Sequence, residues 1–236
     1  MSALLLLLKA GSLGKVLLTS GTMLLSILAY SWFFGWQFAV GFVGLIFAHE
    51  MGHYIAARQR GLNVGAPTFI PFVGAWIQLK DMPHNAETEA YVGIAGPLAG
   101  TIASLAVFFV ARQQSSQLLL AIAYSGFFLN LFNLIPISPF DGGRVTAVLS
   151  PRLWLLGVPI LIGLFLYRPS PLLILMAVMA APNALKAWRG IRTPEEQTYY
   201  VASAETRFNY GLLYVGLAAF LAIMCDELHK ELPRGY

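Results

Sequence analysis

The stretch GLIFAHEMGHYIAAR, residues 44–58, places three ionisable side chains inside an apolar helical run. His49, Glu50 and His53 are flanked on both sides by apolar residues, and the whole run covers residues 37–57. Ionisable groups at membrane depth are costly, and where they occur they mark a functional site. This one stretch therefore indicates a membrane helix with a site built into it.

The composition of the whole chain supports lipid as its surroundings. Of its 236 residues, 58% are hydrophobic and 11% are charged, whereas soluble domains average about 25% charged residues. So few charges cannot cover a soluble globule of this size. We expect one all-α polytopic membrane domain over residues 1–236.

Seven apolar stretches are candidates for membrane helices, which need about 20 residues to span a bilayer. Several are shorter, so we expect six to seven crossings, with the fifth stretch either re-entrant or continuous with the sixth. The leucine run at the N-terminus lacks a preceding basic residue and ends at Lys9, so we expect a retained segment and not a signal peptide. The stretches are residues 16–34, 37–57, 91–111, 117–137, 153–167, 172–188 and 210–225.

The basic residues predict which helix ends face the cytoplasm. With a cytoplasmic N-terminus and seven crossings, eleven of the fifteen Lys and Arg residues face inward, as the positive-inside rule requires. Membrane orientation thereby explains the net charge of +4, and no nucleic-acid partner is expected. We expect a multi-pass protein of a prokaryotic plasma membrane.

Two connections are expected to carry structure of their own. Residues 62–80 break short apolar runs with glycine and proline, which predicts a membrane-associated β-hairpin that turns near Val73-Gly74. Farther along, Thr193 can cap a helix whose first residue is Pro194, and Glu196 completes a capping box. A short polar surface helix is therefore expected near residues 193–207.

The spacing of His49 and His53 puts both imidazoles on one face of a helix, where they can reach one metal ion. Glu50 lies one step round the helix, near a metal-bound water. This is the His-Glu-x-x-His arrangement of zinc proteases, in which zinc lowers the pKa of bound water to about 7. Glu50 would accept a proton as water attacks the peptide carbonyl, and would pass it to the leaving amine.

A catalytic zinc ion needs a third protein ligand. Asp141 lies in LNLFNLIPISPFDGGR, residues 129–144, where two prolines break the helix and Gly142 and Gly143 permit a tight turn. The residues alone leave two equal roles for Asp141, metal ligand and N-cap of the next helix. Three further candidates lie in a polar connection that water should reach, and they are His84, Glu87 and Glu89.

Two asparagines and a glycine pair lie near these motifs. The Asn133 amide can donate to a substrate carbonyl or a developing oxyanion, and it can equally satisfy carbonyls that Pro136 frees. Asn130 is expected to make a polar contact between helices. Gly96 and Gly100 favour close packing, which would bring their helix against the metal helix.

Two other functions are alternatives to proteolysis. A zinc transporter would need ligands spread along a pathway, whereas these candidates converge at one depth. A non-catalytic membrane scaffold that kept a metal site is the second alternative, and the presence of every motif residue argues against it. A zinc protease is therefore the favoured interpretation.

Three blocks of the sequence together resemble the site-2 protease family of intramembrane zinc metalloproteases. They are HEMGH at 49–53, AGPLAG at 95–100 and NLIPISPFDGGR at 133–144. The resemblance covers residues 33–147, the family's catalytic core, and leaves residues 148–236 as additional membrane helices. It implies one Zn²⁺ ion with three ligands, Glu50 as general base and Asn133 on the substrate. The implied ligands are His49, His53 and Asp141.

The resemblance also implies an activity and a kind of partner. The family hydrolyses peptide bonds within or near transmembrane segments of membrane-protein substrates, in regulated intramembrane proteolysis. Residues 58–90 are too few for the PDZ domain that many relatives carry, and the segment after Cys225 is too short for CBS modules. We therefore expect a minimal form of the family in the lipid bilayer.

Overall fold

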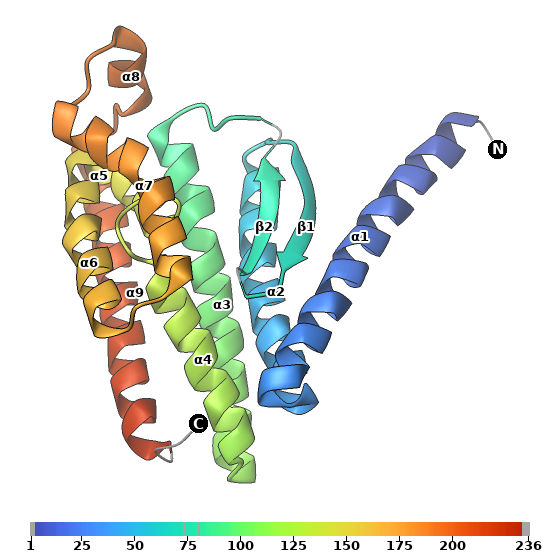
Figure 1. The fold of residues 1–236 in the computed structure, drawn as a ribbon. Helices are drawn as coiled ribbons and strands as arrows, with labels where there is room; N and C mark the ends of the chain where they lie inside the picture. The colour runs from blue at the N-terminus through green and yellow to red at the C-terminus, as the bar shows by residue number, and fades with distance from the viewer. Residues whose placement is uncertain (1–2, 73, 80, 233–236) are drawn as a thin grey trace.

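The computed structural model describes residues 3–72, 74–79 and 81–232, and Figure 1 shows them as a set of helices with one small hairpin. Among the described residues, five helices are long and apolar enough to span a membrane: α1 (Ala3–Phe34, with the apolar span Val16–Phe34), α2 (Trp36–Gln59), α3 (Ala86–Gln114), α7 (Pro171–Arg189) and α9 (Ala204–Glu231). Two apolar helical stretches are shorter, α4 (Gln117–Asn133) and Pro151–Tyr167. The expected all-α membrane fold is confirmed.

The fifth apolar stretch differs most from the expected crossings. It consists of a 3-10 helix, η1 (Pro151–Leu156), followed by α6 (Gly157–Tyr167). It is not continuous with the sixth stretch, because Ser170 caps α7 by accepting a hydrogen bond from the Leu172 N–H. Together η1 and α6 are shorter than the roughly 20 residues of a spanning helix.

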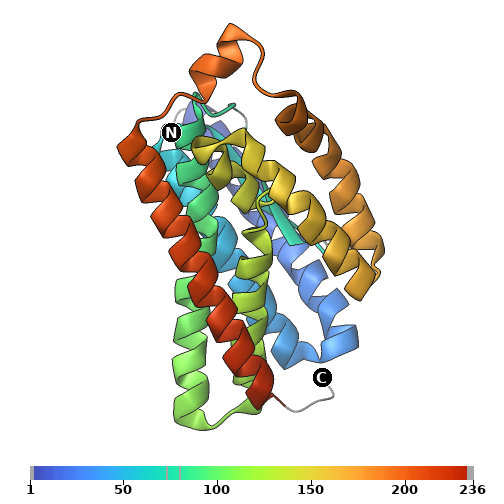
Figure 2. The ribbon, with the colours of Figure 1, turned by 90° about the vertical axis from the view of Figure 1, so that its left-hand side faces the viewer.

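The helix ends fall at two opposite ends of the molecule. The N-terminus, the end of α2, the short helices α5 (Asp141–Leu149) and α8 (Pro194–Tyr199), and the start of α9 lie at one end (Figure 1). The α3–α4 connection and the end of α9 lie at the other end (Figure 2). The chain therefore alternates in direction along the bundle, as a multi-pass membrane protein does.

The expected hairpin is confirmed as two antiparallel strands, β1 (Val64–Ile70) and β2 (Gly74–Leu79). Ile70 pairs with Gly74 across the turn, and Val73, the other residue expected there, lies outside the described residues. Phe72 and Gly74 both have positive φ, of 64° and 121°. Such a turn favours glycine, which meets no steric penalty in this conformation.

Side chains of α1 bind the outer edge of β1. The Thr19 hydroxyl donates to the Pro67 carbonyl over 2.8 Å. The Phe69 N–H donates to the Thr22 hydroxyl over 3.1 Å, and the Phe72 N–H donates to the Tyr30 hydroxyl over 3.2 Å. These side chains take the place of a neighbouring strand and satisfy backbone groups of β1 and of the turn after it.

The expected capping box is confirmed in α8, but the helix is shorter than the predicted range. The Thr193 side chain accepts from the Glu196 N–H, and the Glu196 carboxylate reaches back to the N-cap backbone. The Arg192 N–H and the Lys186 ammonium hold the pKa of Glu196 at about 2. The helix stops at Tyr199, and residues 200–203 connect it to a separate helix, α9. Ser203 caps α9, whose first turn contains residues 204–207.

The α2–α3 contact is close because small residues line it. A Cβ atom on Gly52 would lie 2.3 Å from the Ala95 carbonyl oxygen and 2.8 Å from the Ala99 Cβ. Both alanines belong to the AGPLAG segment, so the expected packing of this segment against the metal helix is confirmed. Helix α3 also packs against α4, α5 and α9 and is thus the centre of the bundle.

Replacing Gly52 by alanine should destabilise the protein, because the new methyl group meets backbone that cannot move aside. Overpacking of this kind costs about 1–3 kcal/mol. Gly44→Ala is the matched control on the same helix, since a Cβ atom there meets nothing within 4 Å. Thermal unfolding in detergent should show a lower Tm for Gly52→Ala only, and equal Tm values for both variants would contradict the packing described.

Candidate metal centre

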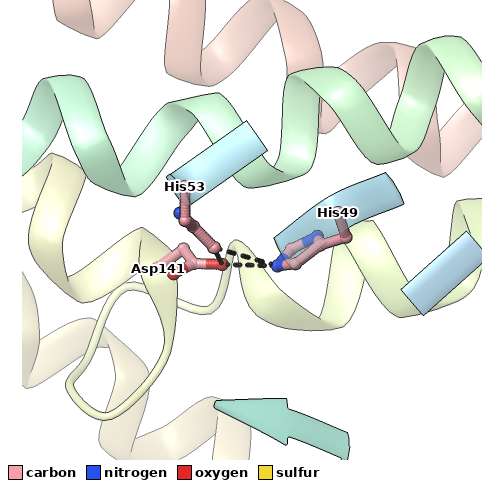
Figure 3. Close-up of side chains that lie close together, drawn as sticks. All are labelled: His49, His53 and Asp141. Carbon is pink, nitrogen blue, oxygen red and sulfur yellow. Dashed lines mark hydrogen bonds and ion pairs between the residues drawn. The ribbon is translucent and has the colours of Figure 1, made fainter. Parts of the chain in front are cut away.

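Three potential ligand atoms converge where α2 meets the start of α5 (Figure 3). The Nε2 atoms of His49 and His53 lie 3.1 Å apart. The Oδ2 atom of Asp141 lies 3.1 Å from the first and 3.2 Å from the second. All three side chains are buried, so water cannot readily neutralise the charge of the cluster.

Hydrogen bonds on the far side of each imidazole fix its tautomer. His53 Nδ1 lies 2.7 Å from the Val92 carbonyl oxygen, which can only accept, so this nitrogen carries the proton. His49 Nδ1 lies 2.8 Å from the Asn130 Oδ1 atom, and it is likewise the donor. In the neutral rings both Nε2 lone pairs therefore point toward the carboxylate.

Three converging lone pairs need a positive charge among them, either a proton or a metal ion, and the arrangement fits zinc. Zn–N and Zn–O distances of about 2.0–2.2 Å around a tetrahedron put neighbouring ligand atoms about 3.3–3.5 Å apart. The separations of 3.1–3.2 Å are close to this range. Two imidazoles and one carboxylate also form the donor set of several catalytic zinc sites, with a fourth position left open.

The α3 backbone makes room for this cluster. A Cβ atom on Gly96 would lie 2.2 Å from His53 Nε2, the atom that faces the other two ligands. A side chain at this position would therefore collide with the His53 imidazole. The glycine pair expected to serve helix packing also clears the space around a ligand.

The proline-broken segment places Asp141 in the bundle. Residues 134–140 form a mostly buried connection between α4 and α5, closed by turn hydrogen bonds such as Phe140 N–H to the Ile137 carbonyl. Asp141 is the first residue of α5, and Phe140 occupies the N-cap position. The alternative role of Asp141 as an N-cap is therefore wrong, and its carboxylate faces the imidazoles.

The two glycines after Asp141 act differently from the prediction. They form the first turn of a helix and not a tight turn. The preceding connection lies directly against them: a Cβ atom on Gly142 would lie 2.1 Å from the Leu134 carbonyl oxygen, and one on Gly143 would lie 2.3 Å from the Ser138 nitrogen. Their lack of side chains lets the broken segment fold back onto α5.

Glu50 lies beside the cluster without joining it. Its side chain is buried, at 7% exposure, and the group of potential ligands comprises only its neighbours. Within the part of the chain that the structure describes, its carboxylate has no hydrogen bond or ion pair. An adjacent and unengaged carboxylate is available to accept a proton.

The other candidate ligands lie elsewhere. His84 is exposed, and Glu89 accepts a hydrogen bond of 2.7 Å from the Tyr199 hydroxyl. Neither these two nor Glu87 belongs to the metal-binding group found among the described residues. Asp141 is therefore the candidate that the fold brings to the two histidines.

The two asparagines differ in their relation to the site. Asn133 is the last residue of α4, and its amide donates to the Leu129 carbonyl over 3.0 Å. Pro136 has no N–H for the carbonyl four residues before it, that of Phe132. This carbonyl accepts from the Ile135 N–H and not from the Asn133 amide. Asn130 makes the expected contact between helices, but sequence reasoning missed that its partner is His49. The available hint in the sequence was that Asn130 lies about one helical turn before Asn133.

Comparisons with known proteins agree with this site. A family model described as peptidase family M50 matches residues 37–116, which contain all of α2 but its first residue, the hairpin and α3. A zinc metalloprotease of Methanocaldococcus jannaschii is 33% identical over 134 residues, covering 54% of this chain and 38% of that protein. A chloroplastic probable zinc metalloprotease of Arabidopsis thaliana is 24% identical over 249 residues, covering 84% of this chain and 44% of that protein. The chain thus spans less than half the length of these two relatives.

A shorter relative is matched over most of its length. A putative zinc metalloprotease of Methanocaldococcus jannaschii is 34% identical over 150 residues, which cover 52% of this chain and 75% of that protein. This match and the family model agree with the three sequence blocks and with the buried ligand cluster. The chain therefore belongs to peptidase family M50, the site-2 protease family.

Proposed function

We propose that this protein is an intramembrane zinc metalloprotease that hydrolyses peptide bonds within or near transmembrane segments of membrane-protein substrates. The observation that carries this proposal is the convergence of His49, His53 and Asp141 inside an apolar helical bundle, with the unengaged Glu50 beside them. The names of the relatives, all zinc metalloproteases, support the same reading.

The three converging side chains would hold one Zn²⁺ ion. A zinc ion bound there supplies Lewis acidity, which makes water a nucleophile near neutral pH and polarises the scissile carbonyl. His49 and His53 offer neutral nitrogen lone pairs and Asp141 offers a charged oxygen, so the ligand set carries one negative charge.

Glu50 is the proposed general base and acid. Its carboxylate would take a proton from the attacking water as the water oxygen bonds to the carbonyl carbon. It would then give that proton to the amine nitrogen as the C–N bond breaks. Its buried position one residue after His49 keeps this proton transfer away from bulk water.

Asn133 is the proposed contact to the substrate. It ends α4 at the start of the segment that carries Asp141, so its amide can be reached from the same region. An amide N–H placed there can donate to the substrate carbonyl and to the oxyanion that develops from it.

The proposed ligands, Glu50 and Asn133 all belong to a proposed catalytic core at 33–147, whose boundary falls inside α5.

The substrate requires a place where its helix can unwind, because helical hydrogen bonds shield peptide bonds from attack. An exposed strand edge can bind such an extended segment by β-addition. The outer edge of β1 is already bonded to α1 side chains. Within the described residues, β2 has no backbone hydrogen bond other than those to β1, so we propose β2 as the docking strand.

Three substitutions should separate metal binding from catalysis. Glu50→Gln should keep about one zinc per chain and lower cleavage of a reconstituted transmembrane peptide about 10²–10⁴-fold, because only the proton carrier is lost. Asp141→Ala should lose both zinc and cleavage, and His84→Ala should keep both. Zinc would be measured by atomic emission on purified protein. Retained cleavage by Glu50→Gln would remove the proposed mechanism.

Proline substitutions along residues 75–78 should reveal the docking edge, because the N–H groups of a strand alternate between its two sides. Where the N–H faces β1, proline should lower the Tm. Where it faces away, proline should leave the Tm unchanged and slow cleavage by up to about tenfold, as expected for one lost hydrogen bond. Cleavage that simply follows Tm at all four positions would exclude β2 as the docking strand.

The proposed orientation places the N-terminus and the end of α2 in the cytoplasm of a prokaryotic cell. In a Cys225→Ser background, a cysteine at position 58 should react with a membrane-impermeant maleimide only in inverted membrane vesicles. A cysteine at position 168, before α7, should react only in right-side-out vesicles. The reverse pattern would show the opposite orientation.

A further inference from the structure

Asn130 is buried in the bundle and touches a proposed metal ligand. It lies on α4 with 0% exposure. Its Oδ1 atom is 2.8 Å from His49 Nδ1, and its Nδ2 atom donates to the Gly126 carbonyl over 2.7 Å. The amide therefore connects the backbone of its own helix to an imidazole on α2, 81 residues away in the sequence.

The Gly126 carbonyl fixes which end of the amide faces the histidine. A carbonyl oxygen can only accept, so the NH₂ group of Asn130 must point toward it. The amide oxygen is then left facing His49, and Nδ1 must supply the proton of that hydrogen bond. The opposite His49 tautomer would carry an N–H on Nε2, pointing at the other two ligands.

We propose that Asn130 is a positioning residue that keeps His49 in its metal-binding tautomer. This inference rests on the proposed function, because it assigns the Nε2 lone pair of His49 to the zinc ion. The two histidines depend on different kinds of support. His53 is held by the Val92 main-chain carbonyl, which no substitution removes, whereas His49 depends on a side chain.

The α3 helix shapes the space that Asn130 occupies. A Cβ atom on Gly100 would lie 2.3 Å from the Asn130 Oδ1 atom and 2.7 Å from its Nδ2 atom. Alanine at position 100 would therefore displace the amide while leaving its chemistry intact. The two glycines of AGPLAG thus serve the two histidines separately, Gly96 by direct contact and Gly100 through Asn130.

Two variants and two controls test this role. Asn130→Leu removes the acceptor at nearly the same volume, and Gly100→Ala displaces it, which keeps the test open if the first variant does not fold. Ser104→Ala removes another buried hydrogen bond of α3, from its hydroxyl to the Gly100 carbonyl, without touching His49. Gly44→Ala adds a methyl group to the metal helix in open space.

The first measurement is zinc affinity of the full chain in detergent, by competition with a chromophoric chelator. Loss of the residue that orients a metal-binding histidine typically weakens binding 10–100-fold, so we expect this loss for Asn130→Leu and Gly100→Ala. Both controls should bind zinc as the unmodified protein does. A purely structural Asn130 would lower the Tm of the metal-free protein and leave the zinc Kd unchanged, which would overturn the inference.

The second measurement is the protonation of His49 Nδ1 in the metal-free protein, by ¹⁵N NMR of histidine-labelled samples. We expect a proton on Nδ1 in the unmodified chain, where Asn130 accepts it and Nε2 is free to share a proton with Asp141, and a smaller Nδ1–H fraction in both variants. An unchanged Nδ1–H fraction would overturn the inference. Should the unmodified chain bind no zinc, the proposed function would fail, while the Nδ1–H fraction would still decide the role of Asn130.

Discussion

The structure depends on three lone pairs that meet in a buried place, where water cannot offset their mutual repulsion. His49, His53 and Asp141 bring three acceptor atoms within 3.1–3.2 Å of one another, and all three side chains are buried. Only a positive charge among them makes this arrangement favourable. The neighbouring helices keep it in place, because Asn130 and the Val92 carbonyl each orient one imidazole.

Irregular backbone at this depth is tolerated because other parts of the chain satisfy it. The segment between α4 and α5 leaves the Leu134 carbonyl free of helical bonds, and the Tyr214 hydroxyl of α9 donates to it over 2.6 Å. The Trp154 indole of η1 donates to the Gly143 carbonyl over 2.8 Å. The helices after the proposed core therefore stabilise the segment that carries Asp141.

In the hairpin, too, other elements satisfy the backbone groups of a strand. Hydroxyl groups of α1 cover one edge of β1, and β2 covers the other. An open edge is thereby left on β2 alone, within the residues that the structure describes. An unpaired edge is a liability in most proteins, and here it is the edge that we propose for docking an extended substrate.

The sequence by itself determined the features that arise from local spacing. His49 and His53 lie four residues apart, so any helix puts them on one face, and the same local logic predicted the hairpin turn and the Thr193 capping box. The residue pattern left Asp141 beside His84, Glu87 and Glu89, and the family resemblance favoured Asp141. Only the tertiary structure brings Asp141 to the two histidines and shows Asn130 hydrogen-bonded to His49. The physical reason is that periodicity describes one helix at a time, whereas a site assembled from α2, α4 and α5 depends on how closely those helices pack. That distance is set by small residues such as Gly52 and Gly96 on facing surfaces, and their partners cannot be read from the sequence.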